Sequence, residues 1–255
     1  MGLRPLDLST WFEIDGCYDE EMALKATLLK DSYDVVVATN PEGDEASREL
    51  LAEVRGFLRT YHPGLAPAVI EGEHPIVEAS RLVQEDLCVL VRDDRWRLRA
   101  ACVCFPSRWS LAAKIGTTLD DIHSPVPLYG EVLARPTRAF FDRLTPERSY
   151  WRLNWTLLDS PVLHQPFGAR TSPRGGLADW FFRVERQTIR QLPQTKAIVF
   201  TIRTYVASAA SLRERDDTFI PALVHALESA PPSVQTYKGW TGVAQQLRDA
   251  LARNE

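Results

Sequence analysis

The sequence has few cysteines, no excess of basic residues and no long apolar run. Its 255 residues include four cysteines, too few for a disulfide framework in a chain of this length, and no C-x-x-C pair occurs. Lys and Arg total 30 against 34 Asp and Glu, whereas nucleic-acid binders normally carry a basic excess. No apolar run approaches the roughly 20 residues that span a bilayer, and residues 1–16 lack the apolar segment of a secretory signal. We therefore expect a cytoplasmic protein that binds neither nucleic acid nor membrane.

The familiar catalytic motifs are also missing. The sequence contains no G-x-S-x-G, Walker, G-x-G-x-x-G or H-E-x-x-H pattern, which argues against the common hydrolase, nucleotide-binding and zinc-protease sites. No segment has the pattern of a flavin, iron–sulfur or nicotinamide module. Any redox chemistry would therefore need electrons from another protein.

The patterns that are present predict an α+β domain. Hydrophobic residues make up 45% and charged residues 25%, as in globular proteins. We expect one domain over 1–255, with a helical part at about 1–80, a sheet core at about 81–205 and a second helical part at about 206–255. The helices expected from apolar periodicity are 19–32, 41–64, 207–214, 217–229 and 241–253. The strands expected from alternation are 87–91, 96–105, 149–158, 179–185 and 196–205.

Several details of this pattern give further expectations. In the strand 96–105, a period of two puts Trp96, Leu98, Ala100, Cys102 and Cys104 on one face. A helical stretch broken by Pro136 is expected before the third strand, and ERQTIRQLP at 185–193 is interpreted as a short helix. The Gly-, Pro- and Ser-rich segment 165–178 is interpreted as a flexible loop.

Among the five histidines, His123 has the most informative surroundings. It lies in KIGTTLDDIHSPVPLYG, where Pro125 and Pro127 fix the backbone on its C-terminal side. A metal or cofactor ligand needs its ring oriented before binding, and a stiff backbone favours that. His62, His74 and His225 have the surroundings of structural or surface residues, and His164 follows the third strand in a loop with no partner at ligand spacing.

A set of short strings then occurs in a fixed order along the chain. They are RLVQEDLCVL at 81–90, CFPSRW at 104–109, KIG at 114–116, IHSPVPLY at 122–129, RLNW at 152–155, RVERQTIRQLP at 183–193, AIVFTIRTY at 197–205 and YKGW at 237–240. Together they resemble the heme-dependent oxidative N-demethylase family, specifically its heme-binding alpha-type subunit. The resemblance implies a PAS-like fold that holds heme b and uses O2 to oxidise a secondary or tertiary methylamine. It also implies a separate reductase-type partner for electron transfer.

Residues can be carried across from the family one by one. His123 matches the I-H-x-P-V-P position, which the resemblance implies is the axial heme ligand, and Asp120 or Asp121 could orient its ring. Two alternatives stay open at this point. A thiolate from Cys102 or Cys104 could ligate the heme iron, or His123 and one of the two aspartates could form a non-heme iron site.

The same strings contain cations and aromatic residues with candidate roles. Four cations could pair with heme propionates: Lys114, Arg152, Arg186 and Arg203. Their alternative role is a salt bridge to Glu85, Asp86 or Glu185. Tyr129, Trp155 and Tyr205 could form walls of a pocket, and ordinary core packing is the alternative for each. The carboxylates that could face a cationic amine are Glu85, Asp86 and Asp121.

The sequence therefore predicts a heme-dependent oxidoreductase that demethylates an N-methyl amine with O2 and releases formaldehyde. The alternative is a non-catalytic PAS-like heme protein that senses oxygen or redox state. A third possibility is a family member that has lost heme and acts as a structural subunit.

Overall fold

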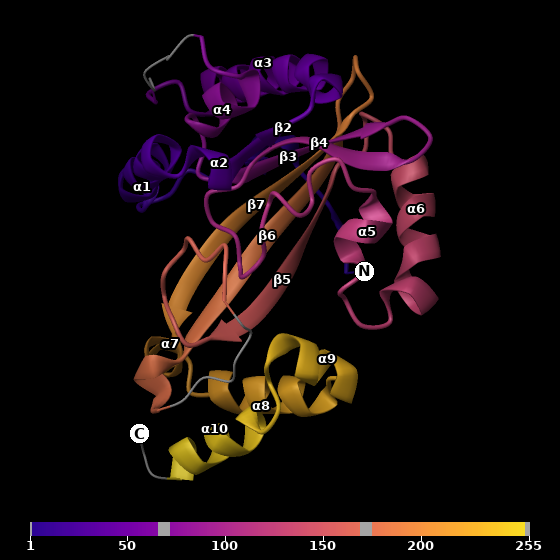
Figure 1. Cartoon of the computed structure of the whole chain (residues 1–255). Helices are drawn as coiled ribbons and strands as arrows, with labels where there is room; N and C mark the ends of the chain where they lie inside the picture. Colours follow the sequence, from indigo (N-terminus) through magenta and orange to yellow (C-terminus); the bar gives the residue numbers. More distant parts are fainter. Residues whose placement is uncertain (1, 66–71, 169–174, 253–255) are drawn as a thin grey trace.

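One antiparallel sheet organises the chain (Figure 1). The computed structural model describes residues 2–65, 72–168 and 175–252. Within them the sheet has seven strands in the order β1-β5-β6-β7-β3-β4-β2. The strands are β1 (Arg4–Pro5), β2 (Val37–Thr39), β3 (Asp86–Arg92), β4 (Trp96–Cys102), β5 (Tyr150–Leu158), β6 (Phe181–Gln191) and β7 (Ile198–Ser208). Each of the five predicted strands is therefore present, and β1 and β2 extend the two edges.

The five long strands have a PAS-like arrangement. β3 and β4 form one hairpin, while β5, β6 and β7 follow one another as antiparallel neighbours. The last strand, β7, then pairs with the first, β3. The α+β class and the PAS-like antiparallel sheet expected from the sequence are thus confirmed.

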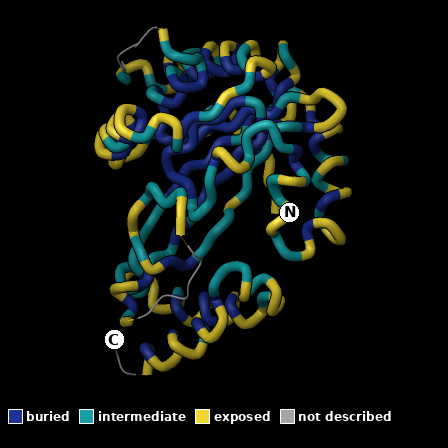
Figure 2. The backbone as a smooth tube through the Cα atoms, viewed as in Figure 1, coloured by how far each residue is buried: buried dark blue, intermediate teal, exposed yellow. Residues whose placement is uncertain are grey.

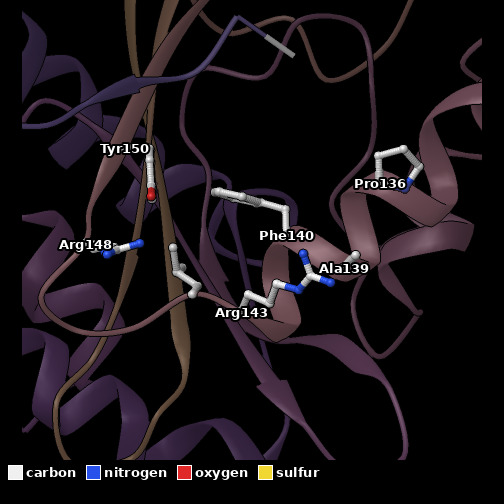
Figure 3. A pocket seen from close by; sticks show the side chains of 7 residues that line it. Pro136, Ala139, Phe140, Arg143, Arg148 and Tyr150 are labelled. Carbon is white, nitrogen blue, oxygen red and sulfur yellow. The ribbon is translucent and has the colours of Figure 1, made fainter.

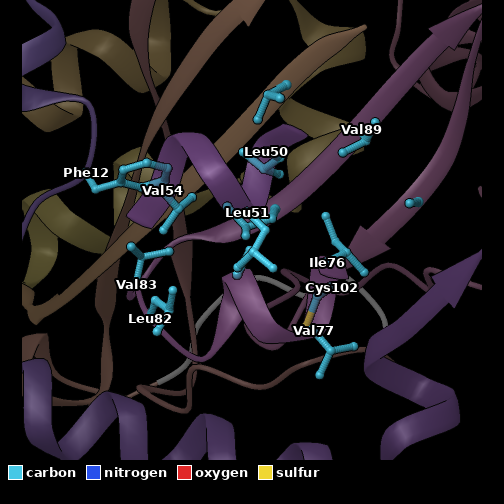
Figure 4. Close-up of a cluster of buried hydrophobic side chains, with 14 of the residues drawn as sticks. Phe12, Leu50, Leu51, Val54, Ile76, Val77, Leu82, Val83, Val89 and Cys102 are labelled. Carbon is cyan, nitrogen blue, oxygen red and sulfur yellow. The ribbon is translucent and has the colours of Figure 1, made fainter. Parts of the chain in front are cut away.

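The N-terminal helices cover one face of this sheet, which we call the N-terminal face (Figure 1). They are α1 (Tyr18–Asp31), α2 (Tyr33–Val36), α3 (Asp44–Tyr61) and α4 (Pro75–Ser80), with 3-10 turns η1 (Leu8–Thr10) and η2 (Pro41–Gly43). Leu50, Leu51, Val54, Phe57 and Leu58 form an apolar stripe on α3 that is buried. Figure 4 shows Leu50, Leu51 and Val54 among side chains from α4 and β3. Burial of this stripe is the main driving force for docking α3, because each such side chain contributes roughly 1.5–3 kcal/mol.

The opposite face, which we call the α5 face, carries the segment between β4 and β5. This segment contains α5 (Leu119–His123), a π-helical turn η3 (Tyr129–Leu133) and α6 (Ala134–Asp142). Leu119 and Phe141 anchor it by packing against Ile189 and Ile198 of the sheet. The break expected at Pro136 is absent. Pro136 lies in the first turn of α6, where a backbone N–H is not needed.

The C-terminal helices form a separate apolar cluster at the far end of β5, β6 and β7 (Figures 1 and 2). They are α7 (Ala209–Arg215), α8 (Phe219–Ser229), α9 (Pro232–Lys238) and α10 (Val243–Ala252), preceded in the chain by the turn η4 (Leu177–Asp179). The three predicted helices are confirmed, and α9 is additional. Helices from both ends of the chain therefore pack on the sheet, while the assignment of 1–255 to one domain stays a prediction.

Two further local expectations were wrong, both because the strands continue differently from their sequence pattern. The segment 185–193 is not a helix, since residues up to Gln191 belong to β6 and pair with β7, with β5 pairing as far as Ile189. Backbone pairing on both sides outweighs the helical spacing of Arg186 and Arg190, and a separation of four also puts two residues on one face of a strand.

The second wrong expectation concerns the face pattern of β4. Val89 pairs with Ala100 but Leu90 pairs with Leu98, so the strand has a β-bulge at this point. Because of the extra residue, β4 residues on the two sides of the bulge that would share a face by a period of two lie on opposite faces of the sheet. Leu98 therefore packs on the α5 face, whereas Ala100 and Cys102 join the N-terminal core. The flexible loop expected at 165–178 includes residues 169–174, which lie outside the described residues.

Candidate functional site

His123 is the last residue of α5, a helix whose start is fixed by side-chain capping. Thr118 Oγ1 accepts from the Asp121 N–H at 3.2 Å, and Asp121 Oδ2 accepts from the Thr118 N–H and hydroxyl at 3.2 and 2.6 Å. Such reciprocal caps typically stabilise a helix by about 1 kcal/mol. Asp121 is therefore engaged at the start of α5, and it holds the helix that carries His123.

The His123 ring is held by contacts on two sides. Its Nδ1 donates to the Leu119 carbonyl at 2.8 Å, which leaves Nε2 with the lone pair. The Tyr129 ring stacks on it, with centroids 5.1 Å apart and planes at 15°. Tyr129 is itself fixed because its hydroxyl donates to Asp120 at 3.1 Å, and Asp120 pairs with Arg138 at 2.7 Å. Within the described residues Nε2 makes no hydrogen bond, so it is the atom available to a ligand.

The surroundings of His123 favour its neutral form. Burial lowers its pKa, the bond to the Leu119 carbonyl opposes this, and the charges of Arg152 and Lys114 lower the pKa further. A neutral imidazole is the form that ligates a metal. Burial and the neighbouring charges thus favour the neutral imidazole at His123, and the bond to Leu119 fixes its ring.

Two of the four predicted cations lie beside His123. Arg152, on β5, donates from Nε to Gln187 Oε1 at 2.8 Å, and burial lowers its pKa. In the described parts of the chain it has no carboxylate within ion-pair distance. Lys114 donates to the Ile122 carbonyl at 2.8 Å, and its Nζ lies 5.6 Å from the centre of the Trp109 ring. The α5 face thus presents positive charge next to the imidazole.

A group of polar side chains on β5 and β6 continues this surface, and the sequence prediction had missed it. Glu185 Oε2 accepts from Asn154 Nδ2 at 3.1 Å and from Gln187 Nε2 at 2.9 Å. Lys238 of α9 donates to Asn154 Oδ1 at 3.2 Å. These residues share the face of Arg152 because Arg152 pairs with Gln187 and Asn154 with Glu185 in the sheet register. The period-two spacing would have indicated this group if 185–193 had also been predicted as a strand.

Arg186 and Arg203 lie on the opposite, N-terminal face of the sheet, where they pair in register with each other. Arg186 donates to the Thr10 carbonyl at 2.6 Å and lies 3.3 Å from Glu13. Arg203 is almost fully buried and contacts Asp15 and Glu21, each at 2.7 Å. Both arginines thus form salt bridges, although not with the carboxylates named from the sequence.

The other sequence candidates are distributed over the molecule. Trp155 stacks on Trp240, with ring centroids 4.5 Å apart, and Tyr205 donates to Glu13 on the N-terminal face. Of the three aromatic candidates, Tyr129 is the one in contact with His123. Glu85 and Asp86 are buried under the N-terminal segment and the end of β4, and burial raises their pKa values to about 7 and about 6.

The two alternative metal sites gain little support from the geometry. Cys102 and Cys104 are buried in the N-terminal core and not on the face of His123. Among the residues that the structure describes, no three His, Cys, Asp or Glu side chains are grouped to hold a metal ion. Nor does that part of the chain contain a helix long and apolar enough to cross a membrane.

A comparison with protein families assigns the chain to a family. The model of the family described as haem-dependent oxidative N-demethylase, alpha subunit-like, matches residues 2–66 and 64–248. The family name implies heme dependence and the presence of other subunits. Since the match covers nearly the whole chain, the protein belongs to the haem-dependent oxidative N-demethylase alpha subunit-like family.

Proposed function

We propose that the chain is a heme-dependent oxidoreductase that removes a methyl group from an N-methyl amine with O2. The observation that carries the proposal is the free Nε2 of a neutral, oriented His123 beside two cations, in a member of this family. Heme b requires one strong axial donor and positive partners for its two propionates. The donor set on the α5 face fits both requirements.

In this proposal each residue of the site has a defined task. His123 would ligate the iron through Nε2, while Leu119 and Tyr129 keep its ring in place. Arg152 and Lys114 would pair with the propionates, since Arg152 has no carboxylate partner of its own in the described chain. Bound heme would supply a redox-active iron that passes electrons from the substrate to dioxygen.

The chain's polar residues would act on the substrate. Removal of a hydride equivalent from the N-methyl carbon leaves an iminium ion, which adds water and separates into the demethylated amine and formaldehyde. Positive charge on the nitrogen is stabilised by a nearby carboxylate. Glu185, held by Asn154 and Gln187 and 3.7 Å from Arg183, is the carboxylate on the face of His123 that would meet this need. It replaces Glu85, Asp86 and Asp121, which are engaged elsewhere.

The proposal also includes a reductase-type partner. Oxidation of the methyl group yields two electrons, whereas reduction of O2 to water needs four. The remaining two would come from a separate subunit, in keeping with the alpha-subunit name of the family.

The experiment is a parallel measurement of heme content and formaldehyde release. The purified chain should show a Soret band, and a methylated amine with O2 and an electron donor should give formaldehyde in equal amount to the demethylated amine. His123→Ala should lose the band and the activity, while the matched variant His225→Ala, on the outside of α8, should retain both. A Soret band with no response to any secondary or tertiary methylamine would instead support the heme-sensing alternative. A chain without heme would support the structural-subunit reading.

A further inference from the structure

A cavity of about 380 Å³ lies between α6 and the start of β5. Its walls include the rings of Phe140 and Tyr150, which meet edge to face with centroids 5.2 Å apart. Pro136, Ala139 and Leu144 complete the apolar lining. Pockets for small organic molecules usually have volumes of about 300–1,000 Å³ and mostly apolar walls. None of the residues proposed to hold heme lines this cavity.

Two arginines stand at its edge. Arg143 follows the end of α6, and Arg148 precedes β5 by two residues. Figure 3 shows Arg143 extending past Phe140 toward Ala139, while Arg148 lies on the side of Tyr150. Neither guanidinium forms an ion pair or a hydrogen bond within the described ranges, even though Glu147 is the sequence neighbour of Arg148. Both charges are therefore available to a ligand at the mouth of an apolar cavity.

We propose that this cavity binds a small organic acid with a flat apolar body. The body would pack against the Phe140 and Tyr150 rings, and the acidic group would accept hydrogen bonds from Arg143 and Arg148. A guanidinium matches a carboxylate with two parallel N–H donors, and this geometry orients the ligand as well as binding it. A neutral ligand of the same shape would contact the apolar walls alone, so the site should distinguish the two ligands by their charge.

The test is equilibrium binding of 2-naphthoate to the full chain, measured by naphthalene fluorescence. 2-Naphthamide serves as the neutral analogue of the same shape. The acid should bind at least about 10-fold more tightly than the amide. Arg143→Gln and Arg148→Gln should each weaken naphthoate binding about 5- to 10-fold, a modest effect because both side chains are exposed. Arg135→Gln is the matched control, since Arg135 is an exposed arginine of α6 outside the cavity lining, and it should leave the affinity unchanged.

Ala139→Leu provides a second test that does not depend on charge. The larger side chain would occupy the cavity, so both the acid and the amide should lose binding while far-UV circular dichroism stays unchanged. Equal affinities for acid and amide, or full affinity in both arginine variants, would overturn the proposal. So would weaker naphthoate binding in His123→Ala, because the probe would then occupy the proposed heme site.

Discussion

Arg152 and Arg203 should respond in opposite ways to the loss of their charge, because they lie on opposite faces of the sheet. Arg152 is partly buried without a carboxylate partner in the described chain, so its charge is useful chiefly when an anion binds. A hydrogen bond to a charged group contributes roughly 1.5–3 kcal/mol, and partial exposure favours the lower half of that range. Arg152→Leu should therefore weaken heme binding about 10- to 30-fold. The stability of the heme-free chain should change by less than about 1 kcal/mol.

Arg203 has the reverse role. Its guanidinium is 1% exposed and pairs with Asp15 and Glu21, which come from the N-terminal segment and α1. Removing one partner of a buried ion pair costs about 3–5 kcal/mol, and the partial exposure of Asp15 places this case near 3 kcal/mol. Arg203→Leu should therefore lower the free energy of unfolding without weakening heme affinity in the folded fraction.

The assay combines heme titration, followed by the Soret band, with urea denaturation of the heme-free chain for the same two variants. Arg152→Leu should lose heme affinity and keep its stability, whereas Arg203→Leu should lose stability and keep its heme affinity. The reasoning would be refuted if Arg203→Leu lost heme affinity while Arg152→Leu kept it, since the propionates would then lie on the N-terminal face.

Three further predictions concern stability and ring orientation. Burial raises the pKa of Glu85 from the ordinary 4.5 to about 7, so this one group contributes a loss of about 3 kcal/mol of stability as pH rises from about 4.5 to 7. Urea melts across that range should show a shallower decline for Glu85→Gln, and an unchanged decline would contradict the assignment. Phe57→Ala should cost about 3–5 kcal/mol in the same melts, because Phe57 is buried among Trp11 and Phe12, and a loss below 1 kcal/mol would argue against this packing. Tyr129→Leu should broaden or shift the Soret band while heme is retained, because the stacked ring orients His123; a spectrum identical to the wild type would exclude that role.

The sequence predicted the fold well wherever one period dominated a segment. The helix at 44–61 follows its apolar periodicity, because Leu50, Leu51, Val54, Phe57 and Leu58 are all buried. The strand predicted at 149–158 is present as β5, although Leu153 on its apolar side is 56% exposed. The segment containing Arg186 and Arg190 was misread because a spacing of four satisfies a helix and a strand equally. Its true state depends on the pairing of β6 with β5 and β7, which is tertiary information.

The candidate site was predicted in part for the same reason. His123, Lys114 and Tyr129 lie within one short segment, so their proximity follows from local structure. Whether a sheet residue joins them depends on the face of the sheet that it occupies, and this is set by how the strands pair and pack: Arg152 lies on the α5 face, whereas Arg203 lies on the other. The bulge in β4 likewise puts Ala100 and Leu98 on opposite faces of the sheet, and the alternation of the sequence does not reveal where a bulge lies.

The most direct test of the heme assignment is chemical rescue of His123→Gly with imidazole. The substitution leaves a space at the ring position, and free imidazole can supply the same nitrogen donor. The account predicts that the wild-type chain binds heme with a histidine-ligated Soret spectrum, that His123→Gly loses it, and that added imidazole restores it. A His123→Gly variant whose heme content and spectrum equal those of the wild type without imidazole would contradict the assignment.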